Sequence, residues 1–218
     1  MSLDVRRHEP ASGTVKSLVV LLHGYGADAA DLIGLAEPLA GVLPDTLFLA
    51  PDAPERCAVN PVGFQWFPIP WIDGSPESAM LESFKRSTVL LDGWLTDAMA
   101  AAGVSEAQTA LVGFSQGTMM SLHVGPRRAS PLAGIVGFSG RLAAGDGSEG
   151  PVQSTPPVLL VHGDSDEVIP VDAIHDARAG LAGQGMAVQW HICKGLGHGI
   201  DPEGLRLAAG FLVSHLKS

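Results

Sequence analysis

Short apolar runs bounded by glycine, proline and aspartate recur along the chain, and stretches with apolar residues three and four positions apart separate them. Several of the runs are continuously apolar, as in parallel strands that are buried on both faces. The alternation predicts an α/β protein with a mostly parallel, doubly wound sheet and helices on both faces. The predicted strands are 18–22, 46–50, 109–113, 134–138, 157–161 and 188–192, and the predicted helices are 31–43, 76–102, 117–127, 171–182 and 203–217.

The chain of 218 residues carries no linker-like tract and no internal repeat, so we expect one domain over residues 1–218. Two segments are long for plain connections. Segment 141–157 is rich in glycine, serine and aspartate, and we expect an ordinary surface loop there.

Segment 51–76 holds prolines at 51, 54, 61, 68, 70 and 76, with Trp66, Phe67 and Trp71 among them. This proline density argues against a central strand or a regular helix. A long aromatic excursion of this kind is either a lid over a site or a packed loop, and the pattern leaves both readings open.

The charge balance excludes some partners. The chain has 13 Lys and Arg against 23 Asp and Glu, a formal charge of −10, which repels nucleic acid and anionic membrane surfaces. The strongest apolar run, 18–22, is far shorter than the roughly 20 residues that span a bilayer, so we expect no stable membrane insertion.

Residues 1–16 are polar and no apolar signal region follows. Cys57 and Cys193 show neither metal-ligand spacing nor a disulfide framework. We therefore expect a cytoplasmic protein with reduced cysteines.

The sequence Gly113-Phe-Ser-Gln-Gly117 follows a predicted strand and precedes a predicted helix. In that context G-x-S-x-G forms a strained elbow that presents the serine hydroxyl at the carboxyl end of the sheet. The free N–H groups and the positive end of the helix would face a developing oxyanion. Five residues with two glycines also suit a structural turn, but the flanking strand and helix favour Ser115 as a nucleophile.

A serine nucleophile needs a base to take its proton. His198 lies in Gly195-Leu-Gly-His-Gly199, a glycine-rich loop directly after the last predicted strand, which can bring an imidazole to the same edge of the sheet. The other histidines downstream fall within predicted helices or a predicted strand (His175, His191 and His215). An isolated loop histidine is usually solvated, but here the pattern favours His198 as the base.

The acid of such a triad lies between the serine and the histidine in the chain. The loop after strand 157–161 offers Asp164, Asp166 and Glu167. We favour Asp166, which would orient the imidazole and stabilise its protonated form. Asp164 fits better as a residue that organises the turn.

An oxyanion hole needs two N–H donors. One is the backbone of Gln116, directly after the nucleophile, and the other should come from His23-Gly-Tyr-Gly26, where we favour the N–H of Tyr25. We expect His23 and His162 to be buried, hydrogen-bonded turn residues. A phosphate loop fits this segment poorly because the lysine and hydroxyl residues of a P-loop are missing.

Together these motifs resemble the phospholipase/carboxylesterase family of α/β-hydrolases, which includes the acyl-protein thioesterases. The matching pieces are 22–28, 50–54, 66–67, 113–117, 138–140, 162–170 and 197–198, in the family's order. The resemblance implies an α/β-hydrolase fold with Ser115, Asp166 and His198 as the triad, and backbone oxyanion donors at Tyr25 and Gln116. It favours Asp166 over Asp164, implies no metal and no organic cofactor, and allows a homodimer.

The chain departs from the family at Tyr25, where Leu is usual, and at Thr118, where Gly is frequent. Apolar residues near the elbow predict a hydrophobic acyl group of short to medium length (Phe114, Met119, Trp66 and Phe67).

The predicted function is a serine carboxylesterase acting on a small ester or thioester. An acyl-protein thioesterase or lysophospholipase is the alternative within the class. A non-catalytic binding module is the alternative outside it, and the intact triad argues against that reading, as the serine argues against a dienelactone hydrolase.

Overall fold

The computed structural model describes residues 3–143 and 150–216. Its centre is a seven-stranded sheet in the order β1-β3-β2-β6-β7-β8-β9, in which only β1 runs antiparallel to its neighbour. Two further short strands, β4 and β5, pair with each other apart from this sheet. The strands are β1 (Val5–His8), β2 (Ser17–Leu22), β3 (Thr46–Pro51), β4 (Glu55–Arg56), β5 (Phe64–Gln65), β6 (Thr109–Phe114), β7 (Gly134–Phe138), β8 (Val158–Gly163) and β9 (Val188–Cys193).

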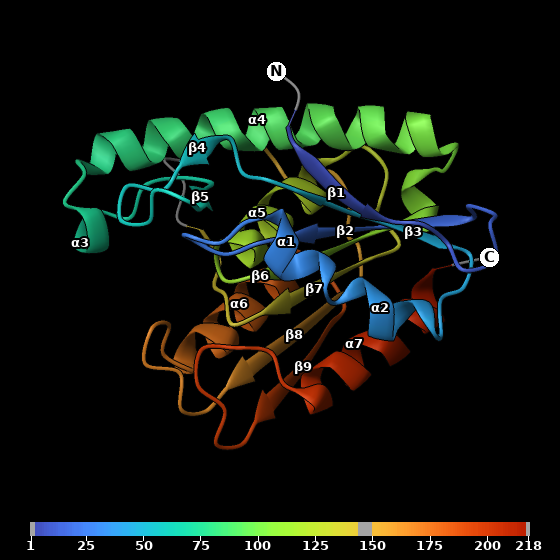
Figure 1. Ribbon diagram of the computed structural model, residues 1–218. Coiled ribbons are helices and arrows are strands. Elements are labelled where there is room, and N and C mark those ends of the chain that lie inside the picture. Colours follow the sequence, from blue (N-terminus) through green and yellow to red (C-terminus); the bar gives the residue numbers. More distant parts are fainter. Residues whose placement is uncertain (1–2, 144–149, 217–218) are drawn as a thin grey trace.

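Helices cover both faces of the sheet (Figure 1). Alternate residues of β2 enter different cores: Leu18, Val20 and Leu22 pack with α4, α5 and α6, whereas Val19 and Leu21 pack with α1, α2 and α7. The predicted doubly wound α/β arrangement is confirmed. The helices are α1 (Ala29–Ile33), α2 (Ala36–Ala40), α3 (Pro70–Asp73), α4 (Glu77–Ala102), α5 (Gln116–Val124), α6 (Asp172–Gly183) and α7 (Pro202–His215), with 3₁₀ turns η1 (Glu106–Gln108) and η2 (Gly125–Arg127).

All six predicted strands are present within one or two residues of their predicted ends. The pattern missed β1, because its sequence Val-Arg-Arg-His has no apolar run and its residues lie at the exposed edge. The single helix predicted over 31–43 is wrong: the chain forms α1 and α2, and Gly34 caps the end of α1. The last predicted helix extended to Lys217, which lies outside the described residues.

The middle of segment 51–76 fits the packed-loop reading. It packs inward, and Trp66 and Phe67 are buried. The end of the segment forms α3, which contradicts the expectation of no regular helix, because a proline at the first helical position costs no hydrogen bond. Gly74, with φ of 72°, ends this helix in the left-handed conformation.

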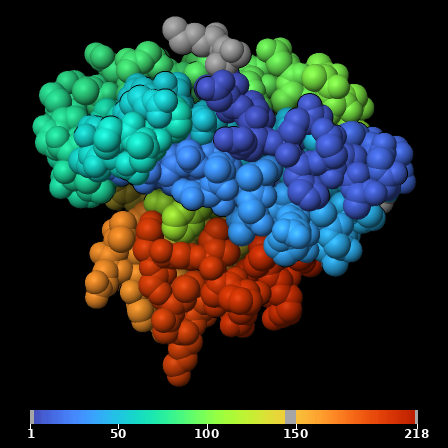
Figure 2. Space-filling view, viewed as in Figure 1, coloured from blue at the N-terminus to red at the C-terminus, as the bar shows by residue number. Residues whose placement is uncertain are grey.

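The sheet topology brings the predicted site residues to one edge. From β2 the chain passes to β3 on one side, whereas β6 pairs with the other side of β2. Such a switch point opens a crevice outside the carboxyl ends of the strands. In the space-filling view a patch of green atoms from the middle of the chain lies between the blue and cyan amino-terminal part and the orange and red carboxyl-terminal part (Figure 2).

Within the described part of the chain, no helix has both the length and the apolar character needed to cross a bilayer.

Candidate active site

Ser115 stands on a strained turn between β6 and α5. Its φ of 54° and ψ of −113° lie in a region that a residue with a side chain rarely adopts. The backbone N–H of Ser115 donates to Phe138 O at 2.9 Å, which holds the strained residue against β7. At Gly117 an added Cβ would lie 1.8 Å from Leu22 O, so only glycine permits this packing of α5 against β2. The geometry is that of a nucleophile elbow.

Asp166 and His198 form a hydrogen-bonded pair. The Nδ1 of His198 lies 2.8 Å from Asp166 Oδ2, and the other carboxylate oxygen accepts the N–H groups of Val168 and Ile169, each at 2.9 Å. The Asp166 side chain is fully buried, and burial opposes its ionisation. The hydrogen bonds from Ile169, His198 and Val168 outweigh burial and lower the pKa of Asp166 below its ordinary value.

The imidazole of His198 lies beside the elbow. Its ring packs on the ring of Phe114, the residue before Ser115, with 4.9 Å between the ring centroids. The loop after β2 reaches the same place, since a Cβ added to Gly24 would lie 3.3 Å from Ser115 Cβ. The structure therefore brings the elbow, the loop of Tyr25 and the loop of His198 together.

Two polar residues hold the loop of His198. Asp164 Oδ1 accepts the N–H of Gly195 at 2.6 Å, so this carboxylate binds the neighbouring loop in addition to its own turn. Ser139, which has φ of 46° at the end of β7, donates its hydroxyl to Gly199 O at 3.3 Å. Neither contact could be predicted from the sequence, because each joins segments far apart in the chain.

His162, at the end of β8, contacts the loop that carries Asp166. This histidine is 1% exposed, and its Nε2 lies 2.9 Å from Ile169 O and 3.3 Å from Asp166 Oδ2. The sequence predicted a buried turn residue here. Its contact with the carboxylate of Asp166 was not predicted.

His23 fixes the peptide unit that carries the Tyr25 N–H. Its Nε2 accepts the N–H of Ala53 at 2.9 Å, so the proton sits on Nδ1, which donates to Gly24 O at 2.7 Å. Since C=O and N–H of a trans peptide point in opposite directions, the orientation of Gly24 O also sets that of the Tyr25 N–H. Burial lowers the pKa of His23, which keeps the ring in this neutral form.

The backbone and the side chain of Gln116 make different contributions to the geometry beside Ser115. Its backbone N–H is the first of α5 and has no partner within that helix. Its buried side chain accepts the N–H of Trp66 at 3.1 Å and donates to Phe67 O at 2.7 Å. Gln116 thus ties segment 51–76 to the elbow, which the sequence did not indicate.

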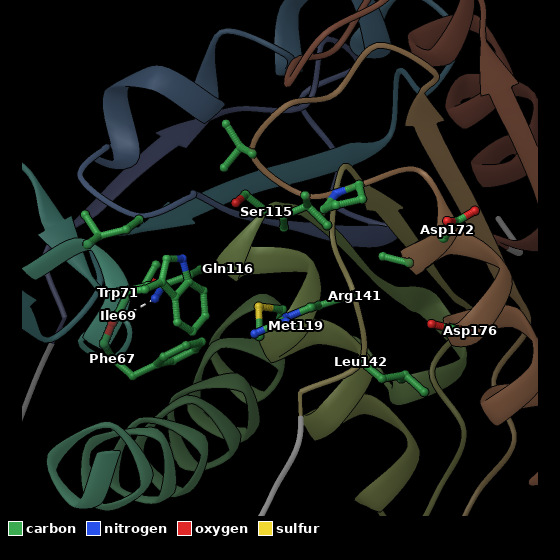
Figure 3. A pocket seen from close by; sticks show the side chains of 15 residues that line it. Phe67, Ile69, Trp71, Ser115, Gln116, Met119, Arg141, Leu142, Asp172 and Asp176 are labelled. Carbon is green, nitrogen blue, oxygen red and sulfur yellow. Dashed lines mark hydrogen bonds between the residues drawn. The ribbon is translucent and has the colours of Figure 1, made fainter. Parts of the chain in front are cut away.

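A cavity of about 440 Å³ opens beside Ser115 and Gln116 (Figure 3). Apolar side chains from several elements make most of its wall, and Arg141, Asp172 and Asp176 bring charge to it. Phe67 and Met119 line it, as expected. The other lining residues are Ile69, Trp71, Ile72, Leu142, Val168, Ile169, Pro170 and Ala173.

Three sequence predictions about the cavity need correction. Trp66 is fully buried and donates its Nε1–H to His23 O at 3.0 Å, so it lies behind the wall and not in it. The ring of Phe114 packs at a tilt against His198 and does not line the cavity. Arg141 and Leu142 do line it, so segment 141–157 is more than a surface loop, although 144–149 lie outside the described residues.

One group of side chains offers metal ligands in the described part of the chain. His191 Nε2, Cys193 Sγ and a carboxylate oxygen of Glu203 lie within 4.8 Å of one another. His191 is already paired with Glu203 at 3.2 Å. Burial, followed by the neighbouring Asp201 and Glu203, raises the pKa of Cys193 to about 12, so its sulfur is a protonated thiol.

Comparison with known proteins agrees with this geometry. A family model described as phospholipase/carboxylesterase matches residues 6–216. The chain belongs to this family. The crystal structure of esterase PE8 is 42% identical, with a TM-score of 0.92 over 99% of this chain and 100% of that chain, so the fold is that of the α/β-hydrolase esterases.

Curated relatives of the family carry esterase and thioesterase names. Esterase YpfH from Escherichia coli (strain K12) is 27% identical over 203 residues, which are 93% of this chain and 82% of the relative. Acyl-protein thioesterase 1 from Gibberella zeae is 27% identical over 221 residues, covering 95% of this chain and 94% of the relative. The chain is thus a member of a hydrolase family that cleaves ester and thioester bonds.

Proposed function

We propose that this protein is a serine carboxylesterase that hydrolyses carboxylic esters with short to medium acyl groups through an acyl-enzyme. The observation that carries the proposal is the strained Ser115 at the start of α5, beside an imidazole that a buried carboxylate holds at 2.8 Å. Strain of this kind persists where the surrounding structure enforces it, and it is frequent at catalytic residues. The proposed triad is Ser115, Asp166 and His198.

In the first half of the reaction the Oγ of Ser115 attacks the ester carbonyl carbon, and His198 Nε2 takes the hydroxyl proton. Because Asp166 accepts from Nδ1, the Nε2 of the neutral ring is the free base. The N–H groups of Tyr25 and Gln116 stabilise the oxyanion, helped by the positive end of α5. The C–O bond to the leaving group then breaks, and the imidazolium protonates the departing alcohol.

In the second half, water attacks the carbonyl carbon of the acyl-enzyme while the same histidine takes a proton from it. The tetrahedral intermediate collapses, the bond to Ser115 Oγ breaks, and the serine regains its proton from His198. The carboxylic acid leaves, and no metal or organic cofactor takes part in the proposed steps.

The size and lining of the cavity support a short to medium acyl group. At about 440 Å³ it lies near the lower end of the range of roughly 300–1,000 Å³ for small-molecule sites. Met119, Phe67 and Leu142 give it an apolar wall that favours an alkyl chain.

A thioester substrate is the second candidate, and the relative named acyl-protein thioesterase 1 favours it. The acyl half of the reaction is the same in both cases, and only the leaving atom differs. Lysophospholipids are the third substrate to compare, because the family model includes phospholipases.

The test compares wild-type protein with Ser115→Ala on three substrate sets: p-nitrophenyl esters of increasing acyl length, acyl-thioesters, and lysolipid dispersions. We expect the highest kcat/KM on esters from acetate to octanoate and a loss of at least about 10⁴-fold in the variant. A higher kcat/KM on long-chain thioesters would favour the second candidate. Equal rates for variant and wild type on every substrate would refute the serine mechanism.

A further inference from the structure

Tyr25 links the proposed oxyanion loop to the wall of the cavity. It is the only tyrosine in the chain, and its hydroxyl donates to Asp73 Oδ2 at 2.9 Å, across 48 positions of sequence. Burial, followed by the Cys57 thiol and the Asp73 carboxylate beside the hydroxyl, raises the pKa of Tyr25 above its ordinary value, so the phenol stays a donor.

Asp73 accepts hydrogen bonds from backbone N–H groups on both sides of α3. Besides the Tyr25 hydroxyl, its Oδ2 accepts the N–H of Ile69 and its Oδ1 accepts the N–H of Ser75, each at 2.9 Å. These two residues flank the four-residue helix at its start and its end. Burial opposes ionisation, but the hydrogen bonds from Ser75, Ile69 and Tyr25 outweigh it and lower the pKa of Asp73. The bond from Tyr25 is therefore made to a charged acceptor, which strengthens it.

The two ends of this link differ in how firmly they are held. The loop of Tyr25 is fixed on both sides, because His23 binds Gly24 O, and Gly26 donates its N–H to Phe64 O at 2.8 Å. In contrast, α3 is one turn long and its Trp71 is 68% exposed. The Cζ atom of Arg141 lies 5.2 Å from the centroid of the Trp71 ring, and exposed cation–π contacts of this kind are weak.

We infer that the Tyr25 hydroxyl, acting through Asp73, positions α3 as a wall of the acyl pocket and so sets the preference for acyl length. Three residues at this helix line the cavity that opens at Ser115: Ile69, Trp71 and Ile72 (Figure 3 labels the first two). The inference rests on the proposed esterase function, since it assigns the cavity to the acyl group. Tyr25 is thus a positioning residue whose side chain acts on specificity, separately from its backbone N–H.

The variant Tyr25→Phe removes one oxygen atom and keeps the ring and the N–H. We expect kcat/KM for the p-nitrophenyl hexanoate ester to fall about tenfold through a higher KM, and this loss should exceed any loss on the acetate ester by at least about fivefold. The acetyl group is too short to use the α3 wall, whereas the longer chain needs it. Asp73→Asn should have the same selective effect, and the double variant should be no worse than the stronger single one, because both changes break one link.

Ser83→Ala is the matched control. The Ser83 hydroxyl donates to the Glu55 carboxylate, so this variant also removes a hydroxyl–carboxylate bond from segment 51–76, but neither residue lines the cavity. We expect a similar change in Tm and no change in the hexanoate to acetate ratio. That difference separates positioning of the acyl wall from a general loss of stability.

An equal loss on acetate and hexanoate in Tyr25→Phe would overturn the inference, because the hydroxyl would then serve the oxyanion or the fold. An unchanged hexanoate to acetate ratio at full activity would overturn it as well. A wild-type protein that hydrolyses no ester or thioester would instead overturn the proposed function itself, so the two failures are distinguishable.

Discussion

Ser115 and Asp166 follow strands β6 and β8, whose residues are almost all buried, whereas α3 and the start of segment 141–157 form part of the wall of the adjacent cavity. At the proposed catalytic edge two N–H groups and an imidazole hold the Asp166 carboxylate, and Phe138 O holds the backbone N–H of Ser115. On the wall, Trp71 and Arg141 are exposed, and a cation–π contact joins them. The difference supports the proposal that buried strands position the reacting groups, while less firmly held segments of the wall contribute to the choice of substrate.

The largest effect should come from a change at the carboxylate that orients the base. Asp166→Asn keeps the size of the side chain but places an amide beside His198 Nδ1, which favours the wrong tautomer for accepting the serine proton. We expect kcat to fall about 10³- to 10⁴-fold with little change in KM. Steady-state kinetics on a short ester measures this.

Asp164→Asn is the control for that change, since Asp164 lies two residues away and binds Gly195 N–H. Its effect on kcat should stay below about tenfold, because an amide oxygen still accepts from the backbone. Equal losses in both variants would contradict the assignment of Asp166 as the acid.

A change in the wall should alter substrate choice and leave the chemistry intact. Met119→Ala enlarges the cavity, so we expect the kcat/KM ratio of octanoate to acetate esters to rise about tenfold, with acetate hydrolysis nearly unchanged. Met120→Ala is the matched control, because its side chain is fully buried in the core and does not line the cavity. Both variants should lose about 2 kcal/mol of stability or more, and only the first should change the ratio.

An unchanged ratio in Met119→Ala would show that acyl groups do not occupy this cavity.

The position of Ser115, Asp166 and His198 at one edge of the sheet could be predicted from the sequence, and the physical reason is local. The elbow is encoded in five consecutive residues, and Ser115, Asp166 and His198 each lie in a loop directly after a strand that the apolar pattern predicted. Parallel strands bring those loops to one edge without any further information.

The wall and the supporting bonds could not be predicted, because they join segments distant in the chain. The link between Tyr25 and Asp73 spans 48 positions, and that between Ser139 and Gly199 spans 60. Trp66 was expected in the wall because it is aromatic and adjacent to Phe67. The two residues lie in a bend directly after β5, and only the fold decides which of them faces the cavity.

The smallest effect should be the contribution of His23 to the dependence of the free energy of unfolding on pH. The pKa of His23 lies below its ordinary value of 6.5 because of burial. Between the folded-state pKa and 6.5 the unfolded chain binds the proton more readily, so the free energy of unfolding should fall as pH is lowered through this window. Above 6.5 the contribution of His23 is fully present and independent of pH.

Urea unfolding from about pH 7 to about pH 5 measures this slope, with His23→Gln as the comparison. The variant should be less stable at pH 7, because the paired N–H of Ala53 and the carbonyl of Gly24 lose their ring partner, but its slope should be smaller. Identical slopes would show that His23 does not titrate in this window.

Ser115 is proposed to be an activated nucleophile, and labelling of the purified protein with a fluorophosphonate, followed by mapping of the adduct, tests this without a choice of substrate. We expect one adduct per chain on Ser115 for the wild type, and none for a folded Ser115→Ala sample treated in parallel. No adduct on folded wild-type protein, or an adduct that persists in the variant, would contradict this proposal.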